Sequence, residues 1–305
     1  MPATTSSPPH ADNAVVRGTV VVRHGSQAIV ETENGERLDC LLRRSSDDLV
    51  AGDRVECRVT GDGTAVIERL LPRNNLLERI TASGRSRPLA ANLTQLVIVV
   101  AVEPATPLSL IDRYLVAAEN QRLRAVIVLN KSDLPKAGEV ADTLAGYPEI
   151  GYELIRVSVP ERLGWNTLLD SLHAQVSAFV GVSGVGKSSI VAELLGDDSI
   201  RTGAVSQATG IGRHTTTETV RYRLEPQDGA LIDSPGVRSF RLGTLERSEV
   251  ARGFREFRPF LGRCRFRDCR HLEEPGCAVR EAAEEGQITR QRLESFWQIA
   301  AELAP

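Results

Sequence analysis

Between Val15 and Leu71, short runs of alternating apolar and polar residues are separated by Gly or Asp. A period of two residues is typical of strands with one buried face, and Gly and Asp favour the turns between them. Five short strands within about 55 residues predict a small barrel, for which an OB-type fold is the best interpretation. The runs are GTVVV, QAIVET, RLDCLL, DRVECRV and TAVIERL.

Further along the chain, apolar runs alternate with stretches of helical periodicity, such as Leu110 to Gln121. Fully apolar runs separated by helices are typical of a parallel sheet that is covered on both faces. The sequence therefore predicts an α/β domain, followed from about Leu245 by a segment with helical periodicity at both ends. The predicted strands are LVIVVAV (96–102), AVIVLN (125–130), LIRVSV (154–159), AFVGV (178–182) and ALIDS (230–234).

These changes of pattern suggest five regions. The first is polar and contains proline, so we expect it to be disordered, and an arginine-rich, aperiodic stretch is expected to link the barrel to the α/β domain. We expect a leader at 1–13, the barrel at 14–72, the linker at 73–90, the α/β domain at 91–244 and the tail at 245–305.

Composition narrows the class of protein. The chain has 41% hydrophobic and 25% charged residues, as in ordinary globular proteins, and its net charge of -3 gives no global attraction to nucleic acid. The longest apolar run, Leu96 to Val102, is too short to span a membrane, and the N-terminus lacks a signal pattern, so a cytoplasmic location and no membrane partner are expected. Of the five cysteines, Cys40 and Cys57 are interpreted as buried thiols.

A glycine-rich stretch follows the predicted strand at 178–182 and fits the phosphate-binding loop G-x-x-x-x-G-K-[ST]. Glycines allow backbone N–H groups to surround phosphates, Lys187 is expected to reach the β- and γ-phosphates, and Ser188 is expected to hold Mg²⁺. Alone, the motif leaves adenine nucleotides, small-molecule kinases and a plain glycine turn open. The predicted phosphate-binding residues are Gly181, Val182, Ser183, Gly184, Val185, Gly186, Lys187 and Ser188.

The sequence Asn130-Lys131-Ser132-Asp133 indicates which nucleotide base the site binds. It ends a predicted strand, at the sheet edge where open α/β folds bind ligands. A carboxylate at Asp133 can accept from both N1–H and the exocyclic amine of guanine, whereas adenine presents an acceptor at N1. An ordinary turn is the alternative, but Ser158 ends the next predicted strand, where GTPases place a backbone N–H against the guanine carbonyl.

Two further elements concern the γ-phosphate. Asp233-Ser-Pro-Gly236 fits the D-x-x-G pattern, in which Asp233 contacts Mg²⁺ through water and the Gly236 N–H senses the γ-phosphate. The stretch GIGRHTTT (210–217) lies where a threonine that closes onto Mg²⁺ belongs, and the sequence does not distinguish Thr216 from Thr217. The alternatives are an ordinary turn at D-S-P-G and a polar loop without function at 210–217.

The order of these elements is a cyclic permutation. Ordinary GTPases begin with the phosphate loop and end with N-K-x-D, whereas here N-K-S-D comes first and D-S-P-G comes last. The second switch therefore lies immediately before the tail, where a movement that depends on the γ-phosphate can pull on the tail.

The tail carries a metal-binding pattern. The spacing Cys264-x4-Cys269-x-His271-x5-Cys277 supplies three thiolates and one imidazole, a closed set suited to one structural Zn²⁺. Four reduced residues in a compact loop are the alternative, and a catalytic zinc is disfavoured because no ligand position remains open.

Arginines crowd the same segment and suit the phosphates of RNA, because only Glu256 and Asp268 oppose them. We interpret the interleaved phenylalanines as core residues of the small domain rather than base-stacking platforms. The arginines are Arg252, Arg255, Arg258, Arg263, Arg265, Arg267 and Arg270, and the phenylalanines are Phe254, Phe257, Phe260 and Phe266.

The permuted order, the sequence GRHTTT and the Cys/His spacing together resemble the bacterial ribosome small-subunit-dependent GTPase A family. The resemblance spans roughly residues 15 to 300. It implies an OB barrel, a permuted GTPase domain and a zinc domain, with GTP or GDP and Mg²⁺ bound. It also implies GTP hydrolysis stimulated by the 30S subunit during late maturation, with binding to 16S rRNA and release on hydrolysis; we expect a monomer. Further matches are Pro72-Arg73 with Arg79, Ala91-Asn92, IDRYL (111–115) and EPGCAV (274–279).

In that family a hydrophobic residue replaces the water-positioning glutamine after D-x-x-G, and Val237 fits. The resemblance makes His214 the candidate catalytic group. Alternatively, His214 is a loop histidine that contacts RNA or solvent. The chain departs from the family at Val159, where alanine is usual, and its barrel has about as many acids as bases, which weakens the case for RNA binding there. Two other functions stay open: an RNA-binding module with GTP as a static ligand, and a phosphoryl-transfer enzyme, which N-K-S-D disfavours.

Overall fold

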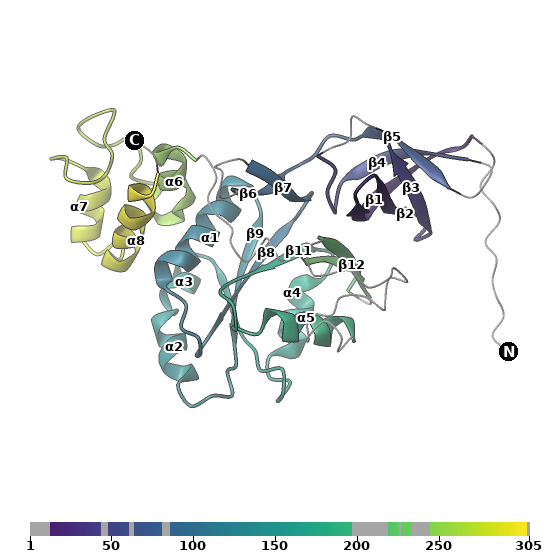
Figure 1. The fold of residues 1–305 in the computed structure, drawn as a ribbon. Helices are drawn as coiled ribbons and strands as arrows, with labels where there is room; N and C mark the ends of the chain where they lie inside the picture. Colours follow the sequence, from purple (N-terminus) through teal and green to yellow (C-terminus); the bar gives the residue numbers. More distant parts are fainter. Residues whose placement is uncertain are drawn as a thin grey trace.

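The computed structural model describes residues 13–43, 48–60, 64–80, 86–196, 219–225, 227–233 and 245–303. A β-barrel lies at one end of a central α/β unit, and a small helical unit that carries the C-terminus lies at the other (Figure 1). The expected leader at 1–13 falls almost wholly outside the described residues, as do His214, Thr216, Thr217, Gly236 and Val237.

The N-terminal barrel is closed and has five strands. Neighbouring strands pair in the order β1-β2-β3-β5-β4, and β4 pairs back onto β1, with β3 and β5 the parallel pair. Every predicted strand of this region is present, and the OB-type barrel is confirmed, because the alternating pattern directs one face of each strand inward. The strands are β1 (Val15–His24), β2 (Gln27–Thr32), β3 (Arg37–Leu42), β4 (Arg54–Val59) and β5 (Ala65–Leu70).

Cys40 and Cys57 lie in the barrel core, as predicted, with exposed fractions of 2% and 0% and their Sγ atoms 3.8 Å apart. They pack among Val20, Val30 and Ile67, so they act as small apolar groups there.

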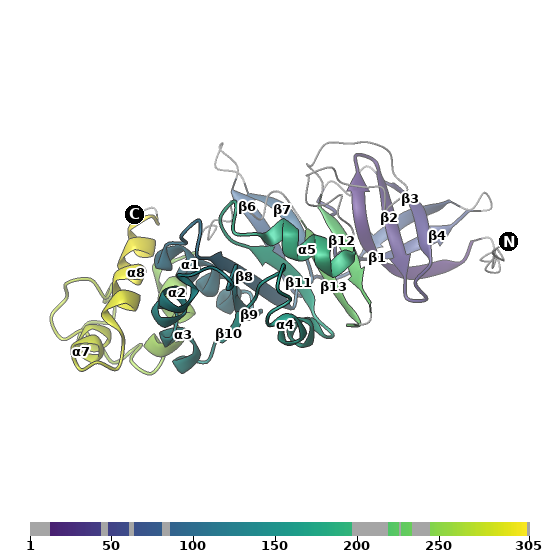
Figure 2. The same ribbon diagram turned by 90° about the horizontal axis from the view of Figure 1, so that it is seen from below.

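The central sheet is parallel except at one edge. Its strands follow the order β10-β9-β8-β11-β13, and β12 is antiparallel to β13 and also touches β1 of the barrel through Val220 and Val22 (Figure 2). All five predicted strands occur, within two residues at their starts, whereas β12 was not predicted. The strands are β8 (Gln95–Ala101), β9 (Arg124–Asn130), β10 (Glu153–Arg156), β11 (Val176–Val180), β12 (Val220–Leu224) and β13 (Gly229–Asp233).

Helices cover both faces of this sheet. Alternate residues of β8 divide between the faces: Leu96 and Ile98 pack with α1, α2 and α3, whereas Val97 and Val99 pack with α4 and α5. Burial on both faces explains why the strands read as continuous apolar runs. The helices are α1 (Leu108–Asn120), α2 (Ala137–Thr143), α3 (Gly146–Glu149), α4 (Trp165–Leu172) and α5 (Lys187–Leu195).

The expected linker at 73–90 is not a structureless connection. It contains most of a hairpin of β6 (Leu76–Ile80) and β7 (Ser86–Ala91), whose Leu77 and Leu89 belong to the same core cluster as Leu96. A shift of register between Leu77 and Glu78 breaks the alternation along β6, which explains why the pattern looked aperiodic.

The hairpin also helps to attach the barrel. Arg73 makes a two-point ion pair with the fully buried Asp53 (2.7 and 2.8 Å), and Asn92 Nδ2 donates to the Gly52 carbonyl at 2.9 Å. These contacts give a structural role to Arg73 and Asn92, two positions in the family matches. Gly52 has φ +88°, and a Cβ there would lie 2.1 Å from the Ala91 carbonyl oxygen, so only glycine fits.

The C-terminal unit packs on α1. Its core is built around Phe254, Phe257 and Phe296, whose rings lie 4.8 to 5.8 Å apart, and Gly253 lets α6 approach Val116 of α1 closely. Phe260 packs against this core, so three of the four phenylalanines between 252 and 270 are confirmed as core residues; Phe266 is 42% exposed and is not. The elements are α6 (Arg247–Gly253), η3 (Arg255–Phe257), α7 (Ala278–Glu284) and α8 (Arg290–Ala301).

A buried ionic network joins this unit to α1. Arg292 of α8 pairs with Asp112 of α1 and with Glu256 (Nε to Oε1, 2.5 Å), and both Asp112 and Arg292 are less than 5% exposed. Burial opposes the charged form of Arg292, but the two carboxylates hold the pKa of its guanidinium above the ordinary value. None of the helices in the described ranges has an apolar stretch long enough to pass through a membrane.

Candidate nucleotide and metal sites

The predicted phosphate-binding loop lies where its motif places it. It begins at Gly181, directly after β11, and Lys187 and Ser188 open α5. Gly181, Gly184 and Gly186 all have positive φ values (138°, 88° and 96°). A Cβ at Gly181 would lie 2.2 Å from the Val99 carbonyl oxygen, so the loop needs glycine both for its backbone conformation and for its close packing on β8.

Lys187 spans this loop. Its Nζ donates to the carbonyl oxygens of Gly181 (2.7 Å) and Val182 (2.6 Å), which holds an ammonium group over the loop at the N-terminus of α5. The positive end of the helix and this ammonium together favour an anion at the same place.

The second predicted motif meets the loop from the neighbouring strands. Asn130 ends β9, is 3% exposed, and its Nδ2 donates to the Val185 carbonyl at 2.9 Å. Lys131 Nζ donates to the Gly184 carbonyl at 2.9 Å, and Ser132 Oγ donates to the Leu129 carbonyl at 2.7 Å. The Asp133 side chain is exposed, so its carboxylate is accessible to a base.

The turn that follows β10 holds the backbone N–H groups nearest to the expected base site. A backbone N–H of this segment is expected to face the guanine carbonyl, and the Ser158 N–H donates to the Leu163 carbonyl at 3.1 Å. In the described part of the chain no acceptor pairs with the next amide, Val159 N–H. The available backbone donor therefore belongs to Val159, the position at which the sequence departs from the family that it resembles.

A cavity of about 560 Å³ opens between these elements, which is within the range for small-molecule sites. Sequence reasoning identified Asn130, Lys131 and Gly186 as site residues and named Val159 only as a departure from the family pattern, but it missed Arg162 and Glu193. Arg162 and Glu193 pair across 31 positions of the chain, so no local spacing could have marked them. The lining includes Asn130, Lys131, Val159, Arg162, Gly186 and Glu193.

Asp233 is the part of the D-S-P-G element that the structure describes. It ends β13, which lies beside β11, the strand that leads into the phosphate loop. The structure thus brings the ends of β9, β11 and β13 to one edge of the sheet, as the motifs predicted.

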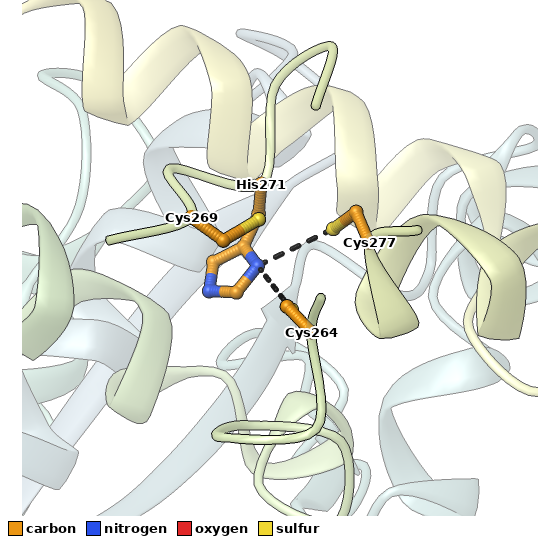
Figure 3. Close-up of side chains that lie close together, drawn as sticks. All are labelled: Cys264, Cys269, His271 and Cys277. Carbon is orange, nitrogen blue, oxygen red and sulfur yellow. Dashed lines mark hydrogen bonds between the residues drawn. The ribbon is translucent and has the colours of Figure 1, made fainter. Parts of the chain in front are cut away.

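A second candidate site lies in the C-terminal unit. The ligand atoms of the four predicted residues all lie within 4.8 Å of one another, and His271 Nδ1 lies 3.5 Å from Cys264 Sγ and 3.4 Å from Cys277 Sγ (Figure 3). Three thiols and one imidazole in this arrangement fit a structural Zn²⁺. Burial lowers the pKa of His271, which favours the neutral imidazole that a metal requires. The cluster consists of Cys264, Cys269, His271 and Cys277.

Neighbouring groups hold these ligands in place. The Glu274 carboxylate accepts from the backbone N–H groups of Arg270 (3.1 Å) and Leu272 (2.9 Å), and Trp297 Nε1 of α8 donates to the His271 carbonyl at 2.8 Å. Such second-layer bonds orient metal ligands, and they give Glu274, a family match, a structural role.

The fold and the nucleotide site together define a P-loop GTPase of the circularly permuted class, because the base motif precedes the phosphate loop in the chain and meets it in space. The sequence model described as RsgA GTPase matches residues 70–243, more than half of the chain. The chain belongs to the RsgA GTPase family and hydrolyses GTP.

Two individual relatives carry the name of the same family. A protein of Chromohalobacter salexigens named small ribosomal subunit biogenesis GTPase RsgA is 48% identical over 288 residues, which cover 92% of this chain and 84% of that protein. One of the same name from Azotobacter vinelandii is 47% identical over 293 residues, covering 94% and 85%.

Two solved structures resemble the whole chain. The crystal structure of YjeQ from Thermotoga maritima has a TM-score of 0.76 and 31% identity, and the match covers 95% of this chain and 99% of that one. YloQ, described as a circularly permuted GTPase, has a TM-score of 0.75 over 97% and 98% of the two chains; at 23% identity this shows the fold alone.

Proposed function

We propose that this GTPase acts in the late maturation of the small ribosomal subunit. In the GTP-bound state it binds immature 30S subunits through their 16S rRNA, and hydrolysis releases it. The name shared by its relatives, small ribosomal subunit biogenesis GTPase, supports this assignment. We further propose that it works as a monomer in the cytoplasm, where small subunits assemble.

The observation that carries the RNA contact is a division among the arginines of the C-terminal unit. Two members of the predicted patch, Arg255 and Arg258, pair with Glu119 of α1 (2.6 and 2.5 Å) and hold the unit against the GTPase domain. The other five are exposed and make no ion pair with any described residue. Those five are Arg252, Arg263, Arg265, Arg267 and Arg270.

Several of these unpaired arginines meet at one hollow. A cavity of about 490 Å³ beside the metal cluster is lined by Arg247, Arg252, Arg267 and Arg270 together with the exposed Phe266, and Asp268 is the one acidic residue of this lining. The Arg247 Nη1 atom is buried there with no hydrogen-bond partner among the described residues. Guanidinium groups without carboxylate partners suit phosphate oxygens, and an exposed ring next to them suits an unstacked base of RNA.

The nucleotide roles follow the motifs. Asp133 reads the guanine edge, and Val159 N–H is the donor that we assign to the guanine carbonyl, in place of Ser158. The phosphate loop and Lys187 hold the phosphates. Bound Mg²⁺, held by Ser188, Thr216 or Thr217 and, through water, Asp233, would neutralise charge that develops on them. Gly236 senses the γ-phosphate, and His214 is the proposed catalytic group because Val237 cannot position water.

The metal has a structural role in this proposal. One Zn²⁺ held by the three cysteines and His271 fixes the loop from residue 264 to residue 277 that presents Arg265, Arg267 and Arg270. The site contributes no step to hydrolysis, because all four ligand positions are filled by protein.

Sedimentation with purified 30S subunits and a non-hydrolysable GTP analogue tests the RNA contact. We expect the double variant Arg267→Ala, Arg270→Ala to bind 30S subunits more weakly. The slope of its log K against log[salt] should be shallower by about 0.7 to 0.9 for each phosphate contact that is lost. The matched control is Arg290→Ala, because Arg290 is 88% exposed on α8 but already pairs with Glu294. Equal affinity and equal slope in wild type and the double variant, with zinc content unchanged, would rule out this face as the RNA contact.

A further inference from the structure

An ion pair joins two residues that line the nucleotide cavity. Arg162 Nη1 lies 2.6 Å from Glu193 Oε1, and both residues line the cavity that Asn130, Lys131 and Gly186 also line. Arg162 belongs to the loop that follows β10, on the side where the base is expected. Glu193 lies on α5, the helix that begins in the phosphate loop. The pair therefore connects the two sides of the cavity.

The loop that carries Arg162 is held as a compact unit. The Ser158 N–H donates to the Leu163 carbonyl at 3.1 Å, and the Glu161 N–H donates to Ser158 Oγ at 3.3 Å. The loop ends at Gly164, where φ is +64° and a Cβ would lie 1.9 Å from the Arg156 carbonyl oxygen. These bonds and the close packing at Gly164 hold the loop from Ser158 to Gly164 in one compact conformation.

The guanidinium of Arg162 has a second contact on its own side. It lies over the ring of Trp165 with Cζ 5.5 Å from the ring centroid, and Trp165 is 6% exposed at the start of α4. A cation over a buried indole is held in orientation as well as in place. Arg162 is thus attached to the base side of the cavity by its backbone and by Trp165, and reaches Glu193 on the other side.

We infer that the Arg162–Glu193 pair acts as a clasp across the nucleotide cavity and slows the release of bound guanine nucleotide. The inference rests on the proposed nucleotide site. Arg162 and Glu193 are positioning residues in it, because they act through the loop and through α5 rather than on the reacting phosphate. A nucleotide leaves when the loop and α5 separate, and separation breaks this pair.

The expected effect is moderate. The side chains of Arg162 and Glu193 are 62% and 27% exposed, so water and salt screen their attraction. Removing either charge should therefore accelerate nucleotide release by about two- to fivefold, which is the factor typical of a partly exposed ion pair. The same screening predicts that release from the wild-type protein becomes faster as the salt concentration rises.

The test measures the dissociation rate of fluorescent mant-GDP from the full-length protein after a chase with excess GDP. The variants are Arg162→Ala, Glu193→Ala, their combination, and the charge exchange Arg162→Glu with Glu193→Arg. The control is Glu153→Ala, which removes an exposed pair with Arg124 (2.5 Å) at the start of β9 and β10, the opposite edge of the same sheet. Thermal unfolding is recorded for each variant.

We expect faster release from both single variants, no further acceleration in the combination, partial recovery in the charge exchange, and a wild-type rate in the control. The salt dependence of release should be weaker in Arg162→Ala than in the wild-type protein. Release rates equal to wild type in both single variants would overturn the clasp, as would the same acceleration in the control. Failure of the wild-type protein to bind mant-GDP would overturn the nucleotide site itself, and the clasp with it.

Discussion

Asn130 Nδ2 donates to the Val185 carbonyl at 2.9 Å, across 55 residues of the chain, and so joins the base motif directly to the phosphate loop. Lys131 adds a bond from Nζ to the neighbouring Gly184 carbonyl. In a permuted chain the base motif precedes the phosphate loop, yet these contacts place them together because both follow parallel strands of one sheet. Permutation changes the order of the elements along the chain and leaves the nucleotide site intact.

This contact makes Gly186 sensitive to substitution. A Cβ at Gly186 would lie 2.2 Å from Asn130 Nδ2, and its φ of +96° disfavours any other residue. We expect Gly186→Ala to weaken mant-GDP binding by about tenfold or more, as 1 to 3 kcal/mol of strain predicts. Gly196→Ala is the control, because Gly196 ends the same helix with φ +64° and has open space around it. Equal affinities of the two variants would contradict this account of the loop.

Asp133 should set the choice of base. An amide at this position can donate to the C2 carbonyl of xanthine but cannot accept from both donors of guanine. We therefore expect Asp133→Asn to lose GTP binding by about a hundredfold or more and to gain binding of xanthosine triphosphate. Competition of both nucleotides against mant-GDP or its xanthosine analogue measures this. An unchanged preference for GTP would mean that Asp133 does not contact the base.

The buried network between α1 and α8 should hold the C-terminal unit in place. Arg292→Met leaves the carboxylates of Asp112 and Glu256, 0% and 7% exposed, without their cation, a change that costs about 3 to 5 kcal/mol. We expect faster hydrogen exchange across residues 245–303 in this variant. Arg290→Ala, on the exposed face of the same helix, should exchange like the wild type. Wild-type protection in Arg292→Met would show that the network does not dock the unit.

Zinc removal should act on the tail alone. We expect Cys269→Ser, or treatment with a strong chelator, to abolish protection of residues 258–285 in hydrogen exchange and to release one equivalent of zinc. Mant-GDP affinity should stay within about twofold of wild type, because the metal cluster contacts none of the nucleotide-site residues described. Unchanged protection of the tail would refute a structural metal.

Elements with one clear period were predictable from the sequence. The barrel strands β3, β4 and β5 alternate between buried and more exposed residues, whereas β8, β9, β11 and β13 are buried along nearly their whole length, and each pattern follows from the exposure of the two sheet faces. The sequence analysis missed β12 (VRYRL), although its apolar residues alternate with Arg221 and Arg223, because it expected continuous apolar runs for the strands of this domain. It missed the β6-β7 hairpin because a shift of register interrupts the alternation of β6.

The residues of the candidate sites also differ in whether the sequence could predict them. The phosphate loop, N-K-S-D and the Cys/His set depend on local spacing, so the residues could be named before the structure was known. The roles of Ser158, Arg162 and Arg255 depend on partners that lie far along the chain or on a turn that closes back on itself. The arginine patch could be counted from sequence, but its division into paired and unpaired members required the position of Glu119 on α1.

The most direct test of the central claim is the rate of GTP hydrolysis by the purified protein with and without purified 30S subunits at low salt, with Lys187→Ala as the control. We expect slow hydrolysis by the protein alone, strong stimulation by 30S subunits, and loss of that stimulation in Lys187→Ala, because Lys187 lies over the phosphate loop. An equal rate with and without 30S subunits would contradict a GTPase that acts on the small ribosomal subunit.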